Sequence, residues 1–164
     1  WNRPLVGFDD DGTPHLRIEF RVMPAGPSVI DMIANAALYY GAVFMLARQD
    51  VPSSLPFEAA RANFYAAAKH GLGAEIAWLD GSRLPVREVI AELIPLAREG
   101  LARQNVSDEL IDRYLSVIEG RHSSGQNGAA WQLAHHARSG DLFELTADYL
   151  EHQRSGMPVH EWPA

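Results

Sequence analysis

The stretch HLRIEFRV at residues 15–22 determines the fold predicted for this chain. Its polar and apolar side chains alternate without a break, which is a strong signal of a β-strand. Successive side chains in a strand point to opposite faces, so this strand has one apolar and one charged face. We predict that the apolar face packs into the core, and it consists of Leu16, Ile18, Phe20 and Val22. The other face carries His15, Arg17, Glu19 and Arg21.

The composition favours a single cytoplasmic domain over residues 1–164. A chain of 164 residues can bury roughly 70% of its unfolded surface without disulfides or metals. The sequence has no cysteine, which excludes a disulfide scaffold and thiolate zinc sites. The net charge is -7 and the 14 Lys and Arg residues form no basic run, so we expect no nucleic-acid partner. No window holds about 18 continuous apolar residues, so we also expect no membrane partner.

The segments around this strand predict an α+β, predominantly helical fold. An opening strand within residues 1–8 and the Asp-Gly turn at 9–14 complete a hairpin, with Pro4 restricting the first arm to an edge or a strand start. Residues 29–48 are apolar almost all round, which indicates a buried helix that Ser28 caps. Further helices are predicted at 57–70, 86–102, 107–119, 129–138 and 141–156, a short strand at 74–79, and loops at 51–56 and 121–128. The outline is two or three antiparallel strands near the N-terminus followed by five or six helices.

The charged face of the 15–22 strand is the first candidate site. A strand places alternate side chains about 6.6–7 Å apart, so Arg17, Glu19 and Arg21 can reach one polyanionic ligand. A carboxylate can hold Mg²⁺, and guanidiniums bind phosphate oxygens in bidentate fashion. From spacing alone, alternating charge on the solvated face of an antiparallel strand is the commoner explanation. Both hypotheses stay open at this point.

The loop at 121–128 is the second candidate. Arg121, Gln126 and Asn127 offer hydrogen-bond donors beside glycines that permit close backbone approach, and the N-terminus of the next helix favours an anion. An ordinary interhelical loop is the alternative. We expect Trp131 to lie in the core, Trp162 to be exposed on a tail that crosses the surface, and the seven histidines to be surface or satisfied residues.

Longer segments carry a family resemblance. The sequence LRIEFRVMPAGPSVIDMIANAALYYGAVFMLA at residues 16–47 resembles the late strand and following helix of glutamine-synthetase-like ligases. Within this group, the sequence is more similar to the glutamate-cysteine ligase type of carboxylate-amine ligase. Three further segments resemble the same type: WNRP at 1–4, GRHSSGQNGAAWQ at 120–132 and MPVHEWP at 157–163. The resemblance runs over most of the chain and implies part of a glutamine-synthetase-like catalytic fold.

The resemblance implies ATP-dependent ligation. A carboxylate of a glutamate-like amino acid is phosphorylated, and an amine then displaces phosphate from the acyl-phosphate to give an amide. The implied cofactors are ATP and Mg²⁺, with Glu19 as the Mg²⁺ ligand. Arg17 would face the nucleotide phosphates, and Arg21 would contact the transferred phosphoryl group or the substrate carboxylate. Arg3 would be a further anion contact, and the loop residues Arg121 and Gln126 would bind the cofactor.

The resemblance also implies an incomplete active site. In that family the sheet and several acidic metal ligands precede the part that this chain resembles. We therefore expect the C-terminal portion of a larger ligase, inactive as the isolated chain. Its expected partners are the glutamate-like substrate, the N-terminal part of the same protein and, as an open possibility, further copies of the chain. The alternative is a helical protein-interaction module without catalytic activity.

Overall fold

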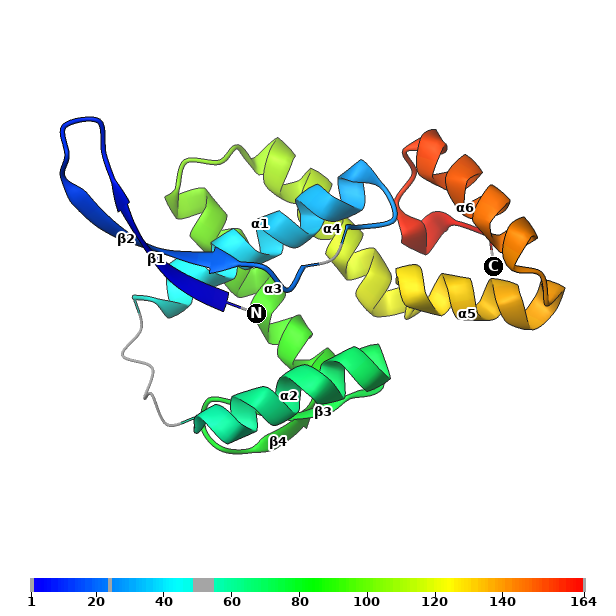
Figure 1. Ribbon diagram of the computed structural model, residues 1–164, viewed down its shortest axis with the longest axis horizontal. Coiled ribbons are helices and arrows are strands. Elements are labelled where there is room, and N and C mark those ends of the chain that lie inside the picture. Colours follow the sequence, from blue (N-terminus) through cyan, green and yellow to red (C-terminus); the bar gives the residue numbers. More distant parts are fainter. Residues whose placement is uncertain (1, 24, 49–54, 164) are drawn as a thin grey trace.

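The computed structural model describes residues 2–23, 25–48 and 55–163 and confirms the α+β, predominantly helical fold (Figure 1). Trp1 and most of the loop predicted at 51–56 lie outside the described residues. Within the described ranges the chain forms two two-stranded sheets and six α-helices. In chain order these are β1 Asn2–Phe8, β2 Pro14–Phe20, α1 Val29–Leu46, α2 Phe57–His70, β3 Glu75–Ala77, β4 Arg83–Pro85, α3 Val86–Arg103, α4 Asp108–Ser124, α5 Gly128–Ser139 and α6 Leu142–Ser155. Short 3₁₀ turns follow α2 at Gly71–Gly73 and α6 at Val159–Glu161.

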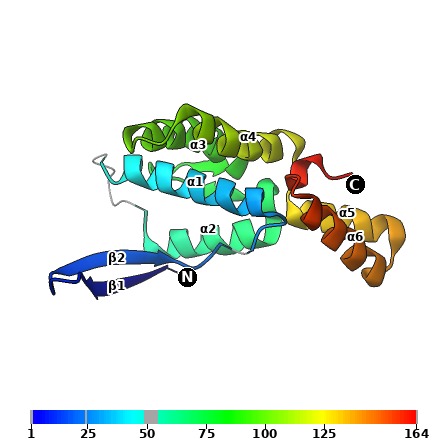
Figure 2. The same cartoon turned by 90° about the horizontal axis from the view of Figure 1, so that it is seen from above.

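Helices α1, α3 and α4 pack together as the helical core of the molecule (Figures 1 and 2). Gly41 of α1 and Gly100 of α3 allow the closest approach. A Cβ atom at Gly41 would lie 2.2 Å from the carbonyl oxygen of Ala97, and one at Gly100 would lie 2.0 Å from that of Gly41. A glycine inside a helix costs intrinsic stability, but here it lets two helix backbones touch. The core thus depends on small residues where α1 meets α3.

Among the described residues, α1 is also the one helix long and apolar enough to cross a bilayer by length and composition. The central helix of a globular domain meets the same criterion. In this structure α1 packs on α3 and α4, with Ala34 and Ala42 buried in the shared cluster. These contacts confirm a core helix, but the predicted burial around most of its surface is wrong: 33% of the helix is buried, and Val29 and Tyr40 are more than 60% exposed.

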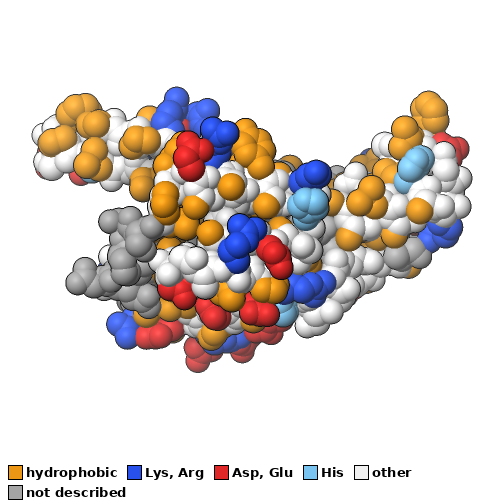
Figure 3. All heavy atoms as spheres, turned by 90° about the horizontal axis from the view of Figure 1, so that it is seen from below, with side chains coloured by type: hydrophobic (Ala, Val, Ile, Leu, Met, Phe, Trp, Pro, Cys, Tyr) orange, Lys and Arg blue, Asp and Glu red, His pale blue; other side chains and the backbone are white. Residues whose placement is uncertain are grey.

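The hairpin of β1 and β2 projects from the helical core (Figures 1 and 2). Its predicted burial is wrong for two of the four apolar residues, because Leu16 is 83% exposed and Ile18 is 68% exposed. The base of the hairpin meets a helix, where the ring of Phe20 stacks on Tyr39 of α1 at 4.2 Å between centroids. The alternation of polar and apolar residues therefore identified the strand, but it did not show whether another element buries the apolar face. We call the uncovered side the apolar face of the hairpin; this face consists of Val6, Phe8, Leu16 and Ile18. Figure 3 shows hydrophobic side chains at the free end of the hairpin.

The second sheet lies against α2, as Figure 1 shows. Strand β3 confirms the short strand predicted at 74–79, and it pairs with β4, which was not predicted. Asn63 of α2 ties the two elements together: its Nδ2 donates to the carbonyl of Ala77 at 2.7 Å, and its Oδ1 accepts from the Ala77 amide at 2.8 Å. This unit packs on the outside of α3 through Val89 and Ile76.

The C-terminal region differs from the prediction in two places. Helix α4 continues through residues 121–124, so the loop predicted at 121–128 shrinks to 125–127. Gly120 does not end the helix; a Cβ atom there would lie 2.3 Å from Nε2 of His160, so glycine makes room for the tail. Trp162 is 3% exposed rather than on the surface, and it packs edge-on against the buried Trp131 at 5.3 Å between ring centroids. The tail is therefore part of a small second core under α5 and α6.

Candidate functional site

The charged face of the hairpin brings three predicted residues into one cluster. Register places Arg3 of β1 opposite Glu19 of β2. Arg3 Nη2 lies 3.0 Å from Glu19 Oε2, and Arg21 Nε lies 2.8 Å from the same oxygen. Strand β2 ends at Phe20, two residues before the predicted end at residue 22. Arg21 therefore lies just outside the strand, but its side chain still contacts Glu19. The result is one carboxylate held between two guanidiniums on a half-exposed surface, which we call the Arg3–Glu19–Arg21 cluster.

The cluster keeps its carboxylate ionised. The hydrogen bond from Arg21, aided by the charges of Arg21 and Arg3, holds the pKa of Glu19 below its ordinary value. Glu19 in turn raises the pKa of Arg21. At neutral pH the cluster therefore carries one negative and two positive charges, so a net positive charge remains for an incoming anion.

Arg17 adds a further cation to the same face. It is two residues from Glu19 in the strand, opposite Leu5, and it is exposed. Among the described residues its side chain forms no ion pair or hydrogen bond, so its guanidinium is free to bind an anion. Mg²⁺ is usually held by one or two carboxylates together with substrate phosphates, and Glu19 supplies one carboxylate beside the guanidiniums of Arg3, Arg17 and Arg21, a type of group that can bind phosphate. This donor set fits a metal-bound polyphosphate.

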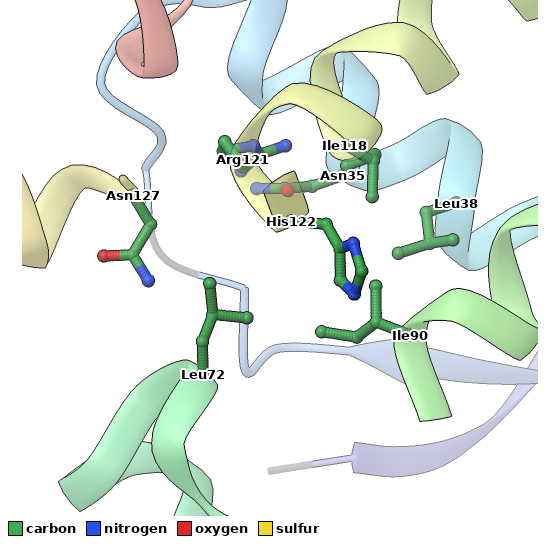
Figure 4. Close-up of a pocket in the computed structure, with 8 residues that line it drawn as sticks. All are labelled: Asn35, Leu38, Leu72, Ile90, Ile118, Arg121, His122 and Asn127. Atoms are coloured by element: carbon green, nitrogen blue, oxygen red, sulfur yellow. The ribbon is translucent and has the colours of Figure 1, made fainter. Parts of the chain in front are cut away.

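Two adjoining cavities run along α1 from the base of the hairpin. The larger, about 460 Å³, is apolar and is lined by Phe20 and Val22 among others. The smaller, about 150 Å³, reaches Arg121 at the end of α4 (Figure 4). Asn35 and Leu38 of α1 line both. The two cavities therefore connect the hairpin base with the second predicted region.

Arg121 lies on a helix and points into the fold rather than extending from a loop. Its side chain is 14% exposed, and its Nε lies 3.7 Å from Oδ1 of the fully buried Asp31. Burial lowers the pKa of Arg121, while the charge of Asp31 acts in the opposite direction. Nη2 of Arg121 and Oδ1 of Asp31 are buried without a hydrogen-bond partner. An unsatisfied buried donor next to a small cavity can bind a polar ligand atom or water.

Gln126 and Asn127 have structural contacts instead. Nε2 of Gln126 donates to the carbonyls of Val159 and Trp162, at 2.8 and 2.7 Å, and so holds the tail. Asn127 caps α5, with Oδ1 accepting from the amide of Ala130 at 2.9 Å. These bonds use both amide protons of Gln126 within the protein. Arg121 and Gln126 make no contact with the Arg3–Glu19–Arg21 cluster among the described residues, so the two predicted regions are separate surfaces.

Two site residues went unrecognised in the sequence. Asp31 accepts from Ser28 Oγ at 2.7 Å and from the amide of Val159 at 3.0 Å, so it links the start of α1 with the tail. Asn35 lies one turn further along α1 and lines both cavities. Two polar residues four apart in an otherwise apolar helix share one face, and this spacing was the signal that could have located them.

The comparisons with known proteins agree with the resemblance. The sequence model of glutamate-cysteine ligase family 2 matches residues 9–148. This range includes β2, the charged residues from Arg17 to Arg21, and all of the helical core. The chain therefore belongs to the glutamate-cysteine ligase family 2. No curated protein and no solved structure matches it.

Proposed function

We propose that this chain supplies part of the active site of an ATP-dependent carboxylate-amine ligase. One observation carries the proposal: within a member of this family, Glu19 is held between Arg3 and Arg21 on an accessible strand face. The family supports ligation, and the charges on this face suit a polyphosphate. The carboxylate donor is then a glutamate-like amino acid, and we place the protein in the cytoplasm.

The proposed reaction has two steps. The γ-phosphoryl group of ATP moves to a substrate carboxylate oxygen, which gives ADP and an acyl-phosphate. The amine nitrogen then attacks the carbonyl carbon, phosphate leaves with the electrons of the broken C–O bond, and the amine loses a proton. Mg²⁺ supplies neutralisation of phosphate charge when bound. Arg17 binds the nucleotide phosphates, Glu19 holds the metal, and Arg21 stabilises the charge on the transferred group.

Arg3 and Arg21 also position Glu19. Both guanidiniums contact Oε2, which orients the carboxylate and keeps it ionised before a metal arrives. When phosphate enters, the two arginines can turn from Glu19 to the phosphate oxygens, because both side chains are about half exposed. The cluster thus holds a metal ligand and anion-binding groups ready in one place.

The same cluster offers only one carboxylate among the described residues. The one close group of three potential metal ligands in the described part of the chain lies elsewhere, on α5 and α6. We therefore propose that the remaining metal ligands come from an N-terminal part of the same protein, and that residues 1–164 alone release no phosphate above background. Robust amide formation by the isolated chain would contradict this proposal.

The test is Glu19→Gln in the full-length protein, with phosphate release measured for pairs of amino acids in the presence of Mg-ATP. The amide keeps the shape but removes the charge that holds the metal, so we expect a loss on the order of 100-fold, as for other preorganised electrostatic contacts. Glu75→Gln in β3 is the matched control, because Glu75 is also an exposed strand glutamate, and it should leave the rate unchanged. Unchanged turnover in Glu19→Gln would exclude the metal role.

A second candidate function, a protein-interaction module, rests on the apolar face of the hairpin. Ile18 and its three neighbours on this face are all more than 60% exposed, and exposed apolar patches often mark interaction sites. Substituting Leu16→Asp distinguishes the two functions. If the full-length protein shows no ligase turnover and Leu16→Asp abolishes binding of a protein partner, the module is favoured. Ligase turnover that is lost in Glu19→Gln would favour the ligase.

A further inference from the structure

Helices α5 and α6 bring three metal-binding side chains together at a place that the proposed ligase chemistry does not use. The two helices are joined by a tight turn at Gly140, where φ is 69°, and they lie side by side in Figures 1 and 2. His135 comes from α5, while Glu144 and Asp148, four residues apart, come from one face of α6. One potential ligand atom of each lies within 4.8 Å of the others.

The histidine is held in a fixed orientation. His135 is fully buried, and its Nε2 lies 2.8 Å from Oδ2 of Asp148. The ring packs against Trp131 at 5.0 Å between centroids, and Ser139 Oγ lies 3.4 Å from Nδ1. A partner on the second ring nitrogen is the arrangement that usually orients a metal-binding imidazole. Nε2 is therefore aimed at the carboxylates of α6.

The carboxylates lack a balancing charge. Glu144 and Asp148 carry like charges at i and i+4, which is destabilising on a helix. In the described part of the chain, neither forms an ion pair with Lys or Arg, and of the two carboxylates only that of Asp148 contacts His135. A hydrogen bond from one imidazole does not compensate two negative charges. A bound cation would remove this imbalance.

We propose that His135, Glu144 and Asp148 form a binding site for a divalent transition-metal ion of the Zn²⁺ class. One imidazole nitrogen and two carboxylates suit Zn²⁺ better than Mg²⁺ or Ca²⁺, which prefer oxygen ligands. In a four-coordinate site with bonds of about 2.0–2.2 Å, ligand atoms lie about 3.4 Å apart. His135 Nε2 and Asp148 Oδ2 are 2.8 Å apart, a hydrogen-bond distance that would widen slightly when an ion displaces the proton between them. The exposed Glu144 side chain can move to complete the set. A fourth position remains for water, and the ion joins α5 to α6.

The test is calorimetric titration of the full chain with ZnCl₂, compared with Glu144→Gln. Glu144 is exposed, so its substitution leaves the fold intact, whereas a change at the buried His135 endangers folding. We expect saturable binding of one ion and a loss of at least about tenfold in affinity in Glu144→Gln and in Asp148→Asn, since even outer-shell changes cost 10–100-fold. At a Zn²⁺ concentration about 100 times the dissociation constant, the thermal midpoint should rise by roughly 5–10 °C in the unsubstituted chain.

Glu109→Gln is the matched control. Glu109 lies in the first turn of α4, as Glu144 does in α6, so both substitutions remove a charge that favours a helix N-terminus. Glu109→Gln should bind Zn²⁺ as the unsubstituted chain does. Equal affinity in Glu144→Gln would show that other histidines capture the ion and would overturn the proposal, as would the absence of saturable binding. Mg²⁺ in place of Zn²⁺ should give no comparable heat or thermal shift.

Discussion

Leu115 of α4 is fully buried, whereas Leu16 of β2 is 83% exposed. The two leucines represent two regions of the molecule. The helical core buries apolar side chains from all three of its helices, such as Ala42 of α1, Leu101 of α3 and Ile118 of α4. The β1–β2 hairpin projects from that core and is joined to it through Phe20 and the residues that follow.

This difference indicates that the two regions have different roles. A two-stranded hairpin alone is at best marginally stable in water, so the hairpin depends on its base contacts and on cross-strand pairs such as Arg3 with Glu19. In return, both of its faces are accessible. The helical core supplies stability, and the hairpin supplies charged groups that can reach a ligand.

The largest expected effect is a difference in the free energy of unfolding between alanine substitutions of the two leucines. Leu115→Ala removes buried methyl groups and leaves a cavity, so we expect a loss of about 3–4 kcal/mol in the free energy of unfolding. Leu16→Ala removes a side chain that contacts little, so the change should stay within about 0.5 kcal/mol. Denaturant titration monitored by circular dichroism measures both. Equal losses would mean that the hairpin packs on something in solution, such as a second copy of the chain.

The next effect concerns the contact between α1 and α3. Gly100→Ala places a Cβ atom 2.0 Å from the carbonyl oxygen of Gly41, which neither backbone can avoid without moving the helices apart. We expect a loss of about 2–3 kcal/mol, as for other overpacked sites. Gly73→Ala is the control, because nothing lies within 4 Å of a Cβ atom there. If both substitutions destabilise equally, helix contact is not the reason for glycine at 100.

Much of the fold could be predicted from the sequence because its signals are local. Alternation located β2, and turn residues located its partner β1. Ser28 was recognised as a cap, and its Oγ does accept from the Asp31 amide. Helix starts and most ends follow from such short-range chemistry. The family match over 9–148 includes two of the segments that carried the resemblance, 16–47 and 120–132.

The errors arise where tertiary contacts override local signals. Gly120 resembled a helix stop, but it is needed because His160 packs against it. Trp162 lies between two prolines of the tail and looked exposed, but it fills the space beside Trp131. Within the candidate site, the Arg3 contact with Glu19 follows from strand register, whereas the pairing of Arg121 with Asp31 joins segments 90 residues apart in sequence. No local pattern specifies such a contact.

The smallest expected effect tests whether the hairpin cluster forms in solution. The Arg21 hydrogen bond is the main cause of the lowered pKa of Glu19, and the charge of Arg3 contributes less. Arg21→Gln should therefore raise the pKa of Glu19 toward its ordinary 4.5, and Arg3→Gln should raise it by a smaller amount. Arg17→Gln is the control, because Arg17 makes no ion pair with Glu19 among the described residues. The carboxyl ¹³C shift of Glu19, followed by NMR against pH, measures all three.

The direction of the pH effect follows from the sign of this shift. A carboxyl whose pKa is lower in the folded than in the unfolded chain stabilises the fold above its ordinary pKa and loses that contribution as pH falls through the folded value. The cluster should therefore weaken only in acid, and added salt should reduce the shift because the charges are exposed. A larger response to Arg3→Gln than to Arg21→Gln would place the dominant contact across the strands. The hairpin register, and not the residue that follows β2, would then orient the Glu19 carboxylate.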